Sequence, residues 1–583
     1  MTKAFVGLSC TGHDGALAIM QHGIIRFAEA AERHYQKKFA INQAPDEYHY
    51  TRNAMLRHLD ADEIVLAKSW STDAGSIWRR QNALLDESIE HFTEYSEVLR
   101  KFQAYHLDSW NGFLQPNIDL SGHGTVRAAA SLGKPIVGVR HYDHHLCHAA
   151  FAAYGSPFRS AAVAVLDGQG EGTGTAFWHF KDGELIPVEK EPYSGPLIEF
   201  YASLGLYYGI MVCLACGFEA VSGEEWKIMG LAPYGRLDEQ LYRTLESFYR
   251  VDGLTVNCTE HSLPLFLGLL EKRVTHKQNF EKAANYAYTF QKFYSDIASR
   301  LLTELHKRTG EDNLVLTGGC ALNSSYNGRL TTCTPFKSLY VPSAPADDGN
   351  AVGAAILASR DFEEETIAAG GFQSPYLGSD VDLRPLEAML DNRSGLNFRR
   401  FDGDSDLTAH VGSLLANGSI IAWMQGRAEF GPRALGNRSI LADPRDVQMK
   451  ARVNGIVKFR ESFRPFAPAI LDEYADEYFH DYQDSPYMER TLTIRPEKRS
   501  SIPAVCHADH TGRLQSVTES RNPRFYRLIK AFHDITGIPV LMNTSLNVMG
   551  RPIVHSIEDA LITFLGSQID HLVIDRYVIS KHS

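Results

Sequence analysis

The chain has 583 residues, of which 44% are hydrophobic and 22% charged, so it is long enough for two to four globular domains. Its 58 Lys and Arg against 70 Asp and Glu give a formal net charge of -12, which excludes a broad basic surface for nucleic acid or anionic membranes and confines any anion site to a local cluster. No cationic leader or apolar run of membrane-spanning length is evident, and the eight cysteines lack a paired framework, so we expect a cytoplasmic protein with reduced thiols.

Two copies of a strand-turn-strand-turn-strand pattern organise the first half of the chain. The strands are predicted at residues 4–9, 16–20 and from 24 onward in the first copy, and at 161–167, 175–180 and 184–188 in the second. Glycine-rich turns follow the first strand of each copy, around His13 and at residues 168–174. We therefore predict duplicated halves whose glycine turns offer backbone N–H groups to phosphate across a nucleotide cleft. The aromatic region from Trp70 to Asn117 has no place in the repeat, and it forms either an insertion that shapes a substrate pocket or ordinary core.

Four of the 24 histidines fall within residues 141–148, just before the second copy. Asp143 is a good N-cap and the stretch after it is rich in Ala, so a helix is predicted from His144 to Tyr154. His144 and His148 then share one face and can chelate one cation, and Asp167, which ends the next apolar strand, can add an oxygen. His141 precedes this helix, and His145 is expected to point elsewhere. The alternative is that the imidazoles cap a helix and hydrogen-bond in a core, but clustering with a downstream Asp favours the metal.

Further turns in this half carry glycines or carboxylates. The CxxC pair Cys213 and Cys216 lies in an apolar stretch, so buried thiols are predicted rather than a zinc or redox site. Residues 222–235 combine charges with glycines that close around a ligand, or form an exposed turn before a helix.

A long helix at about 280–309 precedes a strand at 314–317 and a glycine turn, and a strand at 339–341 precedes a helix at 351–357. Before that last helix, Asp347 or Asp348 is placed to bind a metal or, alternatively, to cap the helix.

The last third of the chain has a different chemistry. Residues 366–385 are rich in Gly, Ser and Pro and make the best linker. Beyond them, Arg and Lys lie among Gly and Pro, a setting in which guanidinium groups bind oxyanions in fixed geometry, although solvated surface charge is the alternative. The basic and amide residues stand in the segments 425–439, 458–468, 513–524 and 542–547.

The motifs HHLCHA, AVLDGQGE, KIMGLAPYG, LTGGCALN, PADDG, GPRALGNRS, FRPFAPAI and MNTSLN together resemble the NodU/CmcH family of O-carbamoyltransferases over nearly the whole chain. The resemblance implies an α/β protein with a duplicated RNase H-like, actin-like ATPase domain at residues 1–365, a linker at 366–385 and a YrdC-like α/β domain at 386–583. One departure from the family pattern is Cys147, where a small apolar residue is usual.

The resemblance also implies an activity in two steps. Carbamoyl phosphate and ATP, the latter with Mg²⁺, would give carbamoyladenylate in the C-terminal domain, and the N-terminal domain would transfer the carbamoyl group to a hydroxyl of a small-molecule acceptor. By motif match, carbamoyl phosphate and ATP would be bound by Arg433, Lys458, Arg464, Arg513, Asn543 and Ser545. The metal would be Fe²⁺, with zinc or manganese as substitutes, held by His144, His148, Asp167 and Asp347. His13 is the candidate general base, with a turn residue bonded to backbone as the alternative, and Lys38 would stabilise an oxyanion near this centre. The adenylate would be lined by Gly168, Gly170, Lys227, Gly230, Gly318, Gly319, Asn323 and Gly349.

Two other functions remain open at this point: a metal-dependent nucleotide or phosphate ester hydrolase, and an ATP-switched binding module. The low basicity argues against a nucleic-acid partner, and no membrane partner is expected. The identity of the acceptor alcohol does not follow from the sequence. Neither does the oligomeric state, although a homodimer is the commonest closed arrangement.

Overall fold

The computed structural model describes residues 1–104, 109–220, 223–362, 373–391 and 396–581. The chain divides into two compact units. Unit 1 comprises residues 1–31, 40–323 and 329–373, and unit 2 comprises residues 374–583 together with two short segments, 32–39 and 324–328. The contiguous division predicted from the sequence did not include these two segments.

Unit 1 contains two five-stranded sheets of the same topology. The first has the order β3-β2-β1-β4-β5, from β1 (Lys3–Ser9), β2 (Ala16–Gln21), β3 (Ile24–Ala30), β4 (Glu63–Ser69) and β5 (Ile136–Tyr142). The second has the order β8-β7-β6-β11-β12, from β6 (Ser160–Leu166), β7 (Thr175–Lys181), β8 (Glu184–Pro187), β11 (Asn313–Thr317) and β12 (Ser338–Tyr340). In both sheets the first three strands are antiparallel and the last two run parallel to the first. The predicted duplication is confirmed, and the unit has the duplicated actin-like α/β fold.

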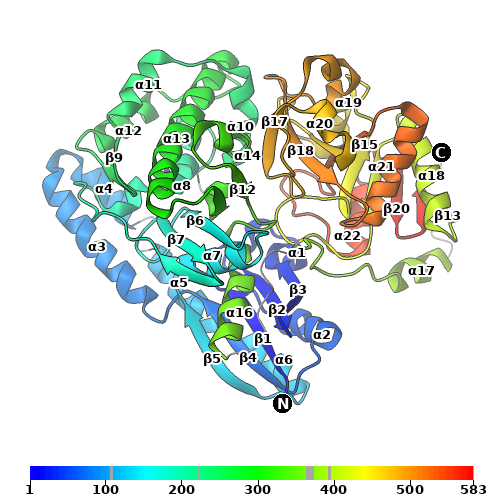
Figure 1. Ribbon diagram of the computed structural model, residues 1–583, viewed down its shortest axis with the longest axis horizontal. Helices are drawn as coiled ribbons and strands as arrows, with labels where there is room; N and C mark the ends of the chain where they lie inside the picture. The colour runs from blue at the N-terminus through cyan, green and yellow to red at the C-terminus, as the bar shows by residue number, and fades with distance from the viewer. Residues whose placement is uncertain (105–108, 221–222, 363–372, 392–395, 582–583) are drawn as a thin grey trace. The chain divides into compact units, whose positions relative to one another are not determined.

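A helix follows the fifth strand of each half, and these two helices pack against each other (Figure 1). They are α7 (His144–Tyr154) and α16 (Asn350–Asp361). Because α16 also contacts β1 and β4 while α7 contacts β6 and β11, the pair forms the layer between the two sheets. Small residues allow the close approach: a Cβ on Gly353 would lie 1.9 Å from the carbonyl oxygen of Cys147, and one on Gly7 would lie 1.9 Å from that of Ala351.

Other helices surround this framework. The helices of the aromatic region are α3 (Ala74–His91), α4 (Ser96–Phe102) and α5 (Ser109–Leu120), and α6 (His123–Ser131) follows them. The remaining helices of more than six residues in unit 1 are α2 (Tyr48–His58), α10 (Glu225–Leu231), α11 (Glu239–Glu246), α12 (Ser262–Glu271) and α13 (Phe280–Thr309). The side chains of Trp78 and Trp110, and residue 222 of the predicted ligand segment, lie outside the described part of the chain. The described part of the aromatic region after residue 73 is mostly helical, and Leu85, Leu99 and Leu114 are buried in it.

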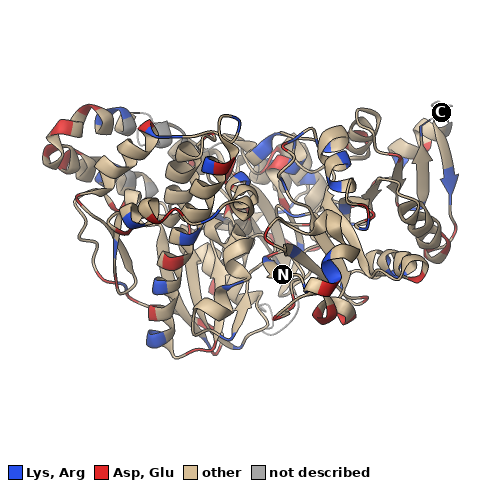
Figure 2. Ribbon diagram, turned by 90° about the horizontal axis from the view of Figure 1, so that it is seen from above, with Lys and Arg blue, Asp and Glu red and all other residues tan. Residues whose placement is uncertain are grey.

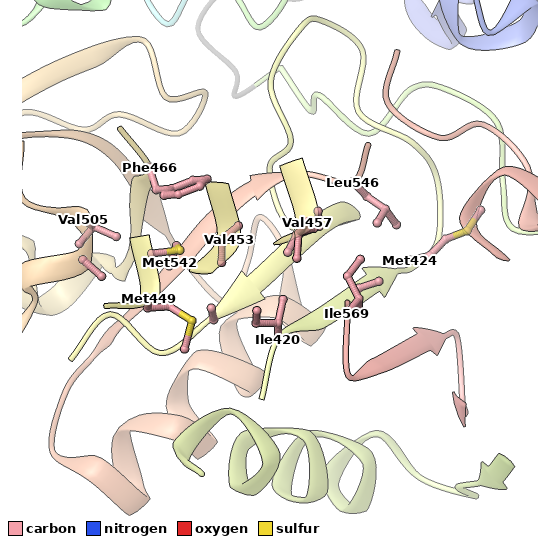
Figure 3. Packing of buried hydrophobic residues seen from close by; sticks show 14 of the residues in the cluster. Ile420, Met424, Met449, Val453, Val457, Phe466, Val505, Met542, Leu546 and Ile569 are labelled. Carbon is pink, nitrogen blue, oxygen red and sulfur yellow. The ribbon is translucent and has the colours of Figure 1, made fainter. Parts of the chain in front are cut away.

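Unit 2 is built on one nine-stranded mixed sheet with the order β13-β21-β20-β14-β15-β19-β16-β18-β17. The strands are β13 (Asn397–Arg400), β14 (Ile421–Met424), β15 (Arg438–Ala442), β16 (Ala467–Leu471), β17 (Arg490–Thr493), β18 (Thr511–Val517), β19 (Val540–Ser545), β20 (His571–Ile574) and β21 (Tyr577–Ser580). Helices α18 (Asp404–Ala416) and α21 (Pro523–Thr536) pack together and bury one apolar cluster with Trp423 and Leu541. Helices α17 (Arg384–Asp391) and α22 (Ile557–Leu565) contribute to a second cluster, seen in Figure 3 around Ile420 and Met542. Unit 2 is thus an α/β domain.

Most elements predicted from the sequence are confirmed. The helix at 280–309 is α13 with the same bounds, and the strand at 314–317 is β11. Cys213 and Cys216 are buried thiols, as predicted. Residues 366–372 of the predicted linker lie outside the described residues, and residues 373–383 form no helix or strand. That second part is not a free linker, since Tyr376 donates a hydrogen bond to the carbonyl of Leu435 in unit 2.

Charged residues of both signs are interspersed along the ribbon of each unit (Figure 2). Within the described residues, none of the helices has both the length and the apolar composition that a bilayer crossing requires.

Candidate functional site

Helix α7 presents two imidazoles on one buried face of unit 1. Asp143 caps the helix, because its carboxylate accepts a hydrogen bond from the backbone N–H of Leu146, and the helix begins at His144 as predicted. His144 and His148 are one turn apart and almost completely buried. Their ring centroids are 4.9 Å apart. Two nitrogen ligands are therefore fixed by a capped helix rather than by a loop.

Two carboxylates complete the group. Asp167 follows β6, and Asp347 begins the 3-10 turn that leads into α16. The Nε2 atom of His144 lies 3.3 Å from Oδ2 of Asp167 and 3.4 Å from Oδ1 of Asp347, and Nε2 of His148 lies 3.8 and 3.4 Å from the same atoms. One ligand atom from each of the four residues falls within 4.8 Å of the other three. The structure therefore brings the four residues predicted to bind a metal together in one buried group.

The ionisation of this group reflects its mixed charges. Burial by itself would lower the pKa of His144, but the carboxylates of Asp347 and Asp167 outweigh burial and raise that pKa to about 10. Burial would raise the pKa of both carboxyls, but the adjacent imidazoles hold them below the usual range of aspartate. Without a cation, the carboxylates therefore hold a proton on His144.

The residues fit a divalent metal. Nitrogen and carboxylate ligands in equal number suit iron(II), zinc or manganese. Nε2 of His148 is buried and makes no hydrogen bond within the described part of the chain, as expected for a ligand atom. The amide of Asn350, fully buried at the start of α16, lies 3.2 Å from Nδ1 of His144, and its Oδ1 has no partner among the described residues. Turning this amide by half a rotation would let Oδ1 accept from Nδ1–H, which leaves Nε2 of His144 free to bind a metal.

Neighbouring groups hold the ligands in place. The backbone N–H of Gly319 donates a hydrogen bond of 2.8 Å to Oδ1 of Asp167, and the other oxygen, Oδ2, is the one that faces the histidines. The ring of His145 packs on Gly170, where a Cβ would lie 2.5 Å from Nε2 of His145. The expectation that His145 points away is wrong, because its Nε2 is 3.7 Å from Asp167. His145 is therefore buried beside the cluster rather than turned from it.

His13 lies beside the cluster, in the turn after β1. Its Nδ1 is 2.9 Å from Asp14 and 3.9 Å from Oδ2 of Asp347. Burial lowers the pKa of His13, but Asp14 and Asp347 more than offset burial and raise the pKa to about 9. The structure therefore places the candidate base close to one of the candidate ligands.

The residues predicted to line an adenylate differ in what they contact. Gly168 is open, with no heavy atom within 4 Å of a built Cβ, whereas a Cβ on Gly318 or Gly349 would lie within 2.4 Å of a carbonyl oxygen. Asn323 exchanges two hydrogen bonds of 3.1 Å with Gln291. Lys227 pairs with Glu224, and Gly230 is buried in α10. Gly318 and Gly349 thus have packing roles, and Gly168 has room for a ligand beside it.

Unit 2 holds a second group, made of buried cations. Lys458 ends a π-helical turn and donates to Oγ of Ser545 at 3.1 Å and to Oδ1 of Asn547 at 2.6 Å. Burial lowers the pKa of Lys458, and the charges of Arg460, Arg464 and Lys38 lower it further. Burial also lowers the pKa of Arg433 to about 10, and the charge of Arg464 adds to this effect. The pKa of Arg513 is lowered by burial and by the charges of Arg433, Arg460 and Arg464. Because buried cations repel one another, a bound anion would stabilise them, and this group therefore favours an anionic ligand.

The core of unit 2 anchors this cationic group. Val457 precedes Lys458 and Leu546 follows Ser545, and both hydrophobic side chains lie in the cluster of Figure 3. Asn543, next to the buried Met542, donates to the carbonyl of Ala434 at 3.1 Å and to Gln515 at 2.8 Å. Six predicted residues, Arg433, Lys458, Arg464, Arg513, Asn543 and Ser545, therefore all lie in unit 2.

The loop that carries Arg433 is held by a buried carboxylate. Oε1 of Glu429 accepts from the backbone N–H groups of Leu435, Asn437 and Arg438 at 2.8, 2.8 and 3.1 Å. Arg33, from the segment 32–39, donates to the carbonyl of Gly431 at 2.9 Å. Lys38 belongs to the same segment, which the structure groups with unit 2.

Several residues in contact with these two groups were missed from the sequence. Asn350 follows the PADDG motif and Glu429 lies inside the arginine-rich segment, so both stood beside recognised motifs without a signal of their own. Trp70 and His507 carried no spacing that pointed to a site, and Glu171 and Arg460 stood inside recognised segments without being singled out. The contacts of Trp70 with His144 and of Glu171 with Ser71 join positions far apart in the chain.

Two models of known protein families match the chain. The model of the carbamoyltransferase N-terminus matches residues 4–356, and that of the carbamoyltransferase C-terminus matches residues 412–581. Nodulation protein NolO of Bradyrhizobium diazoefficiens is 36% identical over 75% of this chain and 79% of its own, and an uncharacterized protein of Synechocystis is 32% identical over 99% and 96%. Nodulation protein U of Rhizobium tropici is 28% identical over 98% of this chain and 95% of its own.

Solved structures resemble the chain more distantly. Full-length HypF in its phosphate- and nucleotide-bound form aligns at 13% identity with a TM-score of 0.35, over 63% of this chain and 56% of HypF. A ROK hexokinase from Thermus thermophilus aligns with a TM-score of 0.30. Both parts of the sequence match the models of one family, and together those matches span most of the 583 residues. The chain belongs to the carbamoyltransferase family.

Proposed function

We propose that this carbamoyltransferase is ATP-dependent and acts on a hydroxyl of a small molecule. Unit 2 would use carbamoyl phosphate, water and ATP to make carbamoyladenylate, phosphate and pyrophosphate. Unit 1 would then transfer the carbamoyl group to the alcohol and release AMP. The observation that carries this proposal is the buried cationic group of unit 2, since a hydrolase that used only the metal ligands of unit 1 would not need it.

In unit 2, the cations would bind substrates that repel one another. Carbamoyl phosphate and the triphosphate of ATP, bound with Mg²⁺, both carry negative charge. Arg433, Arg464 and Arg513 would neutralise this charge and hold a carbamate oxygen in line with the α-phosphate. Lys458 is held by Ser545 and Asn547, so its ammonium group has a fixed position. We assign Lys38 to this group because its charge acts on Lys458.

In unit 1, His144, His148, Asp167 and Asp347 would hold iron(II), with zinc or manganese as substitutes. When bound, such a metal supplies a positive charge that stabilises the phosphate of the leaving AMP. His13, whose pKa is raised to about 9 by Asp14 and Asp347, would take the proton of the acceptor alcohol in its neutral form, which a cation held by Asp347 would favour. The glycine turn at 168–174 would receive the adenylate beside the open Gly168. The acceptor is a small alcohol rather than nucleic acid, in keeping with the net charge of -12.

The experiment supplies purified protein, iron(II), Mg²⁺ and ATP, with and without carbamoyl phosphate, and measures AMP and pyrophosphate. With carbamoyl phosphate we expect pyrophosphate, and with an accepting alcohol we expect equimolar AMP and a carbamoyl mass gain on that alcohol. A panel of alcohols screened by mass identifies the acceptor. Equal consumption of ATP without carbamoyl phosphate would contradict the proposal and favour a hydrolase.

A further inference from the structure

A histidine in unit 2 has a buried ring nitrogen without a partner. His507 lies in the turn before β18 and is 8% exposed. Its Nδ1 is 3.1 Å from Oγ1 of Thr511, whereas its Nε2 is buried and makes no hydrogen bond within the described residues. Such an atom in a buried position requires an explanation, because an unmade hydrogen bond is costly there.

The hydrogen bonds of the turn fix which nitrogen carries the proton. Oγ1 of Thr511 lies 2.7 Å from Oδ1 of Asp509, a contact between two oxygens that needs a proton between them. The hydroxyl of Thr511 has one proton and donates it to Asp509. Its oxygen therefore accepts from Nδ1–H of His507, and Nε2 is left with a lone pair.

The environment keeps this ring neutral. Burial lowers the pKa of His507, and the positive charges of Arg513 and Lys450 lower it further. Asp509 and the backbone of Phe466 raise the pKa but do not offset burial, so the pKa falls to about 4. At neutral pH, Nε2 of His507 is therefore a hydrogen-bond acceptor among cations.

The strand places this acceptor beside the cationic group. Successive side chains of β18 point to opposite faces of the sheet. Leu514 lies in the apolar core, and a Cβ on Gly512 would meet Pro468, Ile494 and Phe479 of the same side. Thr511, Arg513 and Gln515 take the other face, where Gln515 donates to the carbonyl of Leu435 in the Arg433 loop. His507, bonded to Thr511, is thus on the face that carries the anion-binding residues.

We propose that His507 determines the specificity for the acyl group, with Nε2 accepting a hydrogen bond from the amino group of carbamoyl phosphate. This inference rests on the proposed function. Arginine and lysine only donate hydrogen bonds, so they bind the phosphate of any acyl phosphate equally well. An acyl phosphate without N–H, such as acetyl phosphate, leaves the lone pair of His507 buried and unpaired. Sites that demand a hydrogen bond reject the analogue that lacks it.

The test compares His507→Leu, which removes the acceptor, with His507→Gln, which offers an amide oxygen. His510→Asn is the matched control, because His510 is an exposed histidine of the same turn with φ 65, which Asn tolerates. For the full-length protein, dissociation constants are measured by calorimetry for carbamoyl phosphate, acetyl phosphate and inorganic phosphate. We expect the wild type and His510→Asn to prefer carbamoyl phosphate to acetyl phosphate. His507→Leu should lose about 10- to 100-fold of that preference without a change in the affinity for inorganic phosphate, and His507→Gln should regain part of it.

The other outcomes separate the inference from the proposed function. If the wild type binds carbamoyl phosphate with preference and His507→Leu keeps that preference, the inference is wrong and the proposed function stands. If His507→Leu weakens the binding of inorganic phosphate as much as it weakens the binding of carbamoyl phosphate, His507 has a structural role and the inference is also wrong. If the wild type does not bind carbamoyl phosphate, both fail. Nitrogen-15 NMR of the ring gives an independent check, since a proton on Nε2 of the free protein would overturn the assignment of the acceptor.

Discussion

The indole ring of Trp70 lies 4.5 Å from the imidazole ring of His144, measured between ring centroids, with 38° between their planes. Trp70 follows β4 directly and has φ 76, a left-handed conformation that costs a bulky residue about 1–3 kcal/mol. The turn is held by Glu171 of the glycine loop, which accepts from both N and Oγ of Ser71 at 2.7 and 2.6 Å. The carbonyl of Trp70 also lies 3.3 Å from Nδ1 of His141. A strained turn fixed from two sides thus packs an aromatic ring on a candidate metal ligand.

We predict that Trp70 orients His144 for metal binding. Trp70→Leu removes the aromatic face and should weaken the binding of cobalt(II), used as a spectroscopic substitute, about 10-fold, in the range seen for residues that support metal ligands. Trp70→Phe keeps an aromatic ring and should stay within about threefold of the wild type. The absorption bands of bound cobalt report the ligand geometry directly. Equal affinity and identical bands for the Leu variant would show that the stacking has no part in holding the ligand.

A second prediction concerns pH and the metal. In the absence of a cation, His144 has a pKa raised to about 10, so its ring is protonated at neutral pH. A metal needs the lone pair of Nε2, and binding must therefore release this proton. The affinity should rise about tenfold per pH unit from about pH 7 and level off as the pH passes the raised pKa. Calorimetry in two buffers with different ionisation enthalpies counts the released protons, and a count of zero at pH 7.5 would contradict the assignment.

A third prediction separates the two groups of residues. Arg433→Ala removes a cation from unit 2 and should abolish the formation of carbamoyladenylate and pyrophosphate. His144→Ala removes a metal ligand from unit 1 and should leave adenylate formation intact while it blocks transfer to the alcohol. Radiolabelled ATP resolves the two steps by single-turnover kinetics. Loss of adenylate formation in both variants, with both folded by circular dichroism, would show that the two steps are not divided in this way.

The sequence predicted local structure well, because local signals determine it. The N-cap at Asp143 and the 30-residue helix α13 were predicted with their bounds, from capping chemistry and amphipathic period. The duplication also had a physical consequence that the pattern alone did not show. His144 and His148 belong to the helix after the fifth strand of the first half, and Asp347 stands just before the equivalent helix of the second half. Three of the four candidate metal ligands, His144, His148 and Asp347, therefore come from matching positions of the two halves, whereas Asp167 follows the first strand of the second half.

What the sequence could not predict depends on contacts between distant residues. The strain at Trp70 has no signal, since its hydrophobic side chain suits any core. The segment 32–39 joins unit 2 through Arg33, whose partner Gly431 is 398 residues away. Asn350 and His507 are single polar residues, and the role of each depends on which of its side-chain atoms lacks a hydrogen-bond partner in the described part of the chain. The long-range hydrogen bonds of Arg33 with Gly431 and of Asn350 with His144 follow from the fold and not from spacing.

The last prediction concerns Glu429, whose Oε1 accepts from three backbone N–H groups of the loop that carries Arg433. Glu429→Ala leaves these groups without an acceptor in a buried place, which should destabilise unit 2 by about 3 kcal/mol, because each unmade buried hydrogen bond costs about 1–3 kcal/mol and the loop relaxes in part. Glu429→Gln keeps an acceptor oxygen and should cost about 1 kcal/mol. Glu519→Ala, which breaks an exposed ion pair with Arg527, is the control and should change stability by less than about 0.5 kcal/mol. Urea unfolding measures the stability, and hydrogen exchange measured by mass spectrometry should show faster exchange at residues 435–438 in the Ala variant. If exchange there is unchanged, Glu429 does not hold the loop, and the fixed position of Arg433 must have another cause.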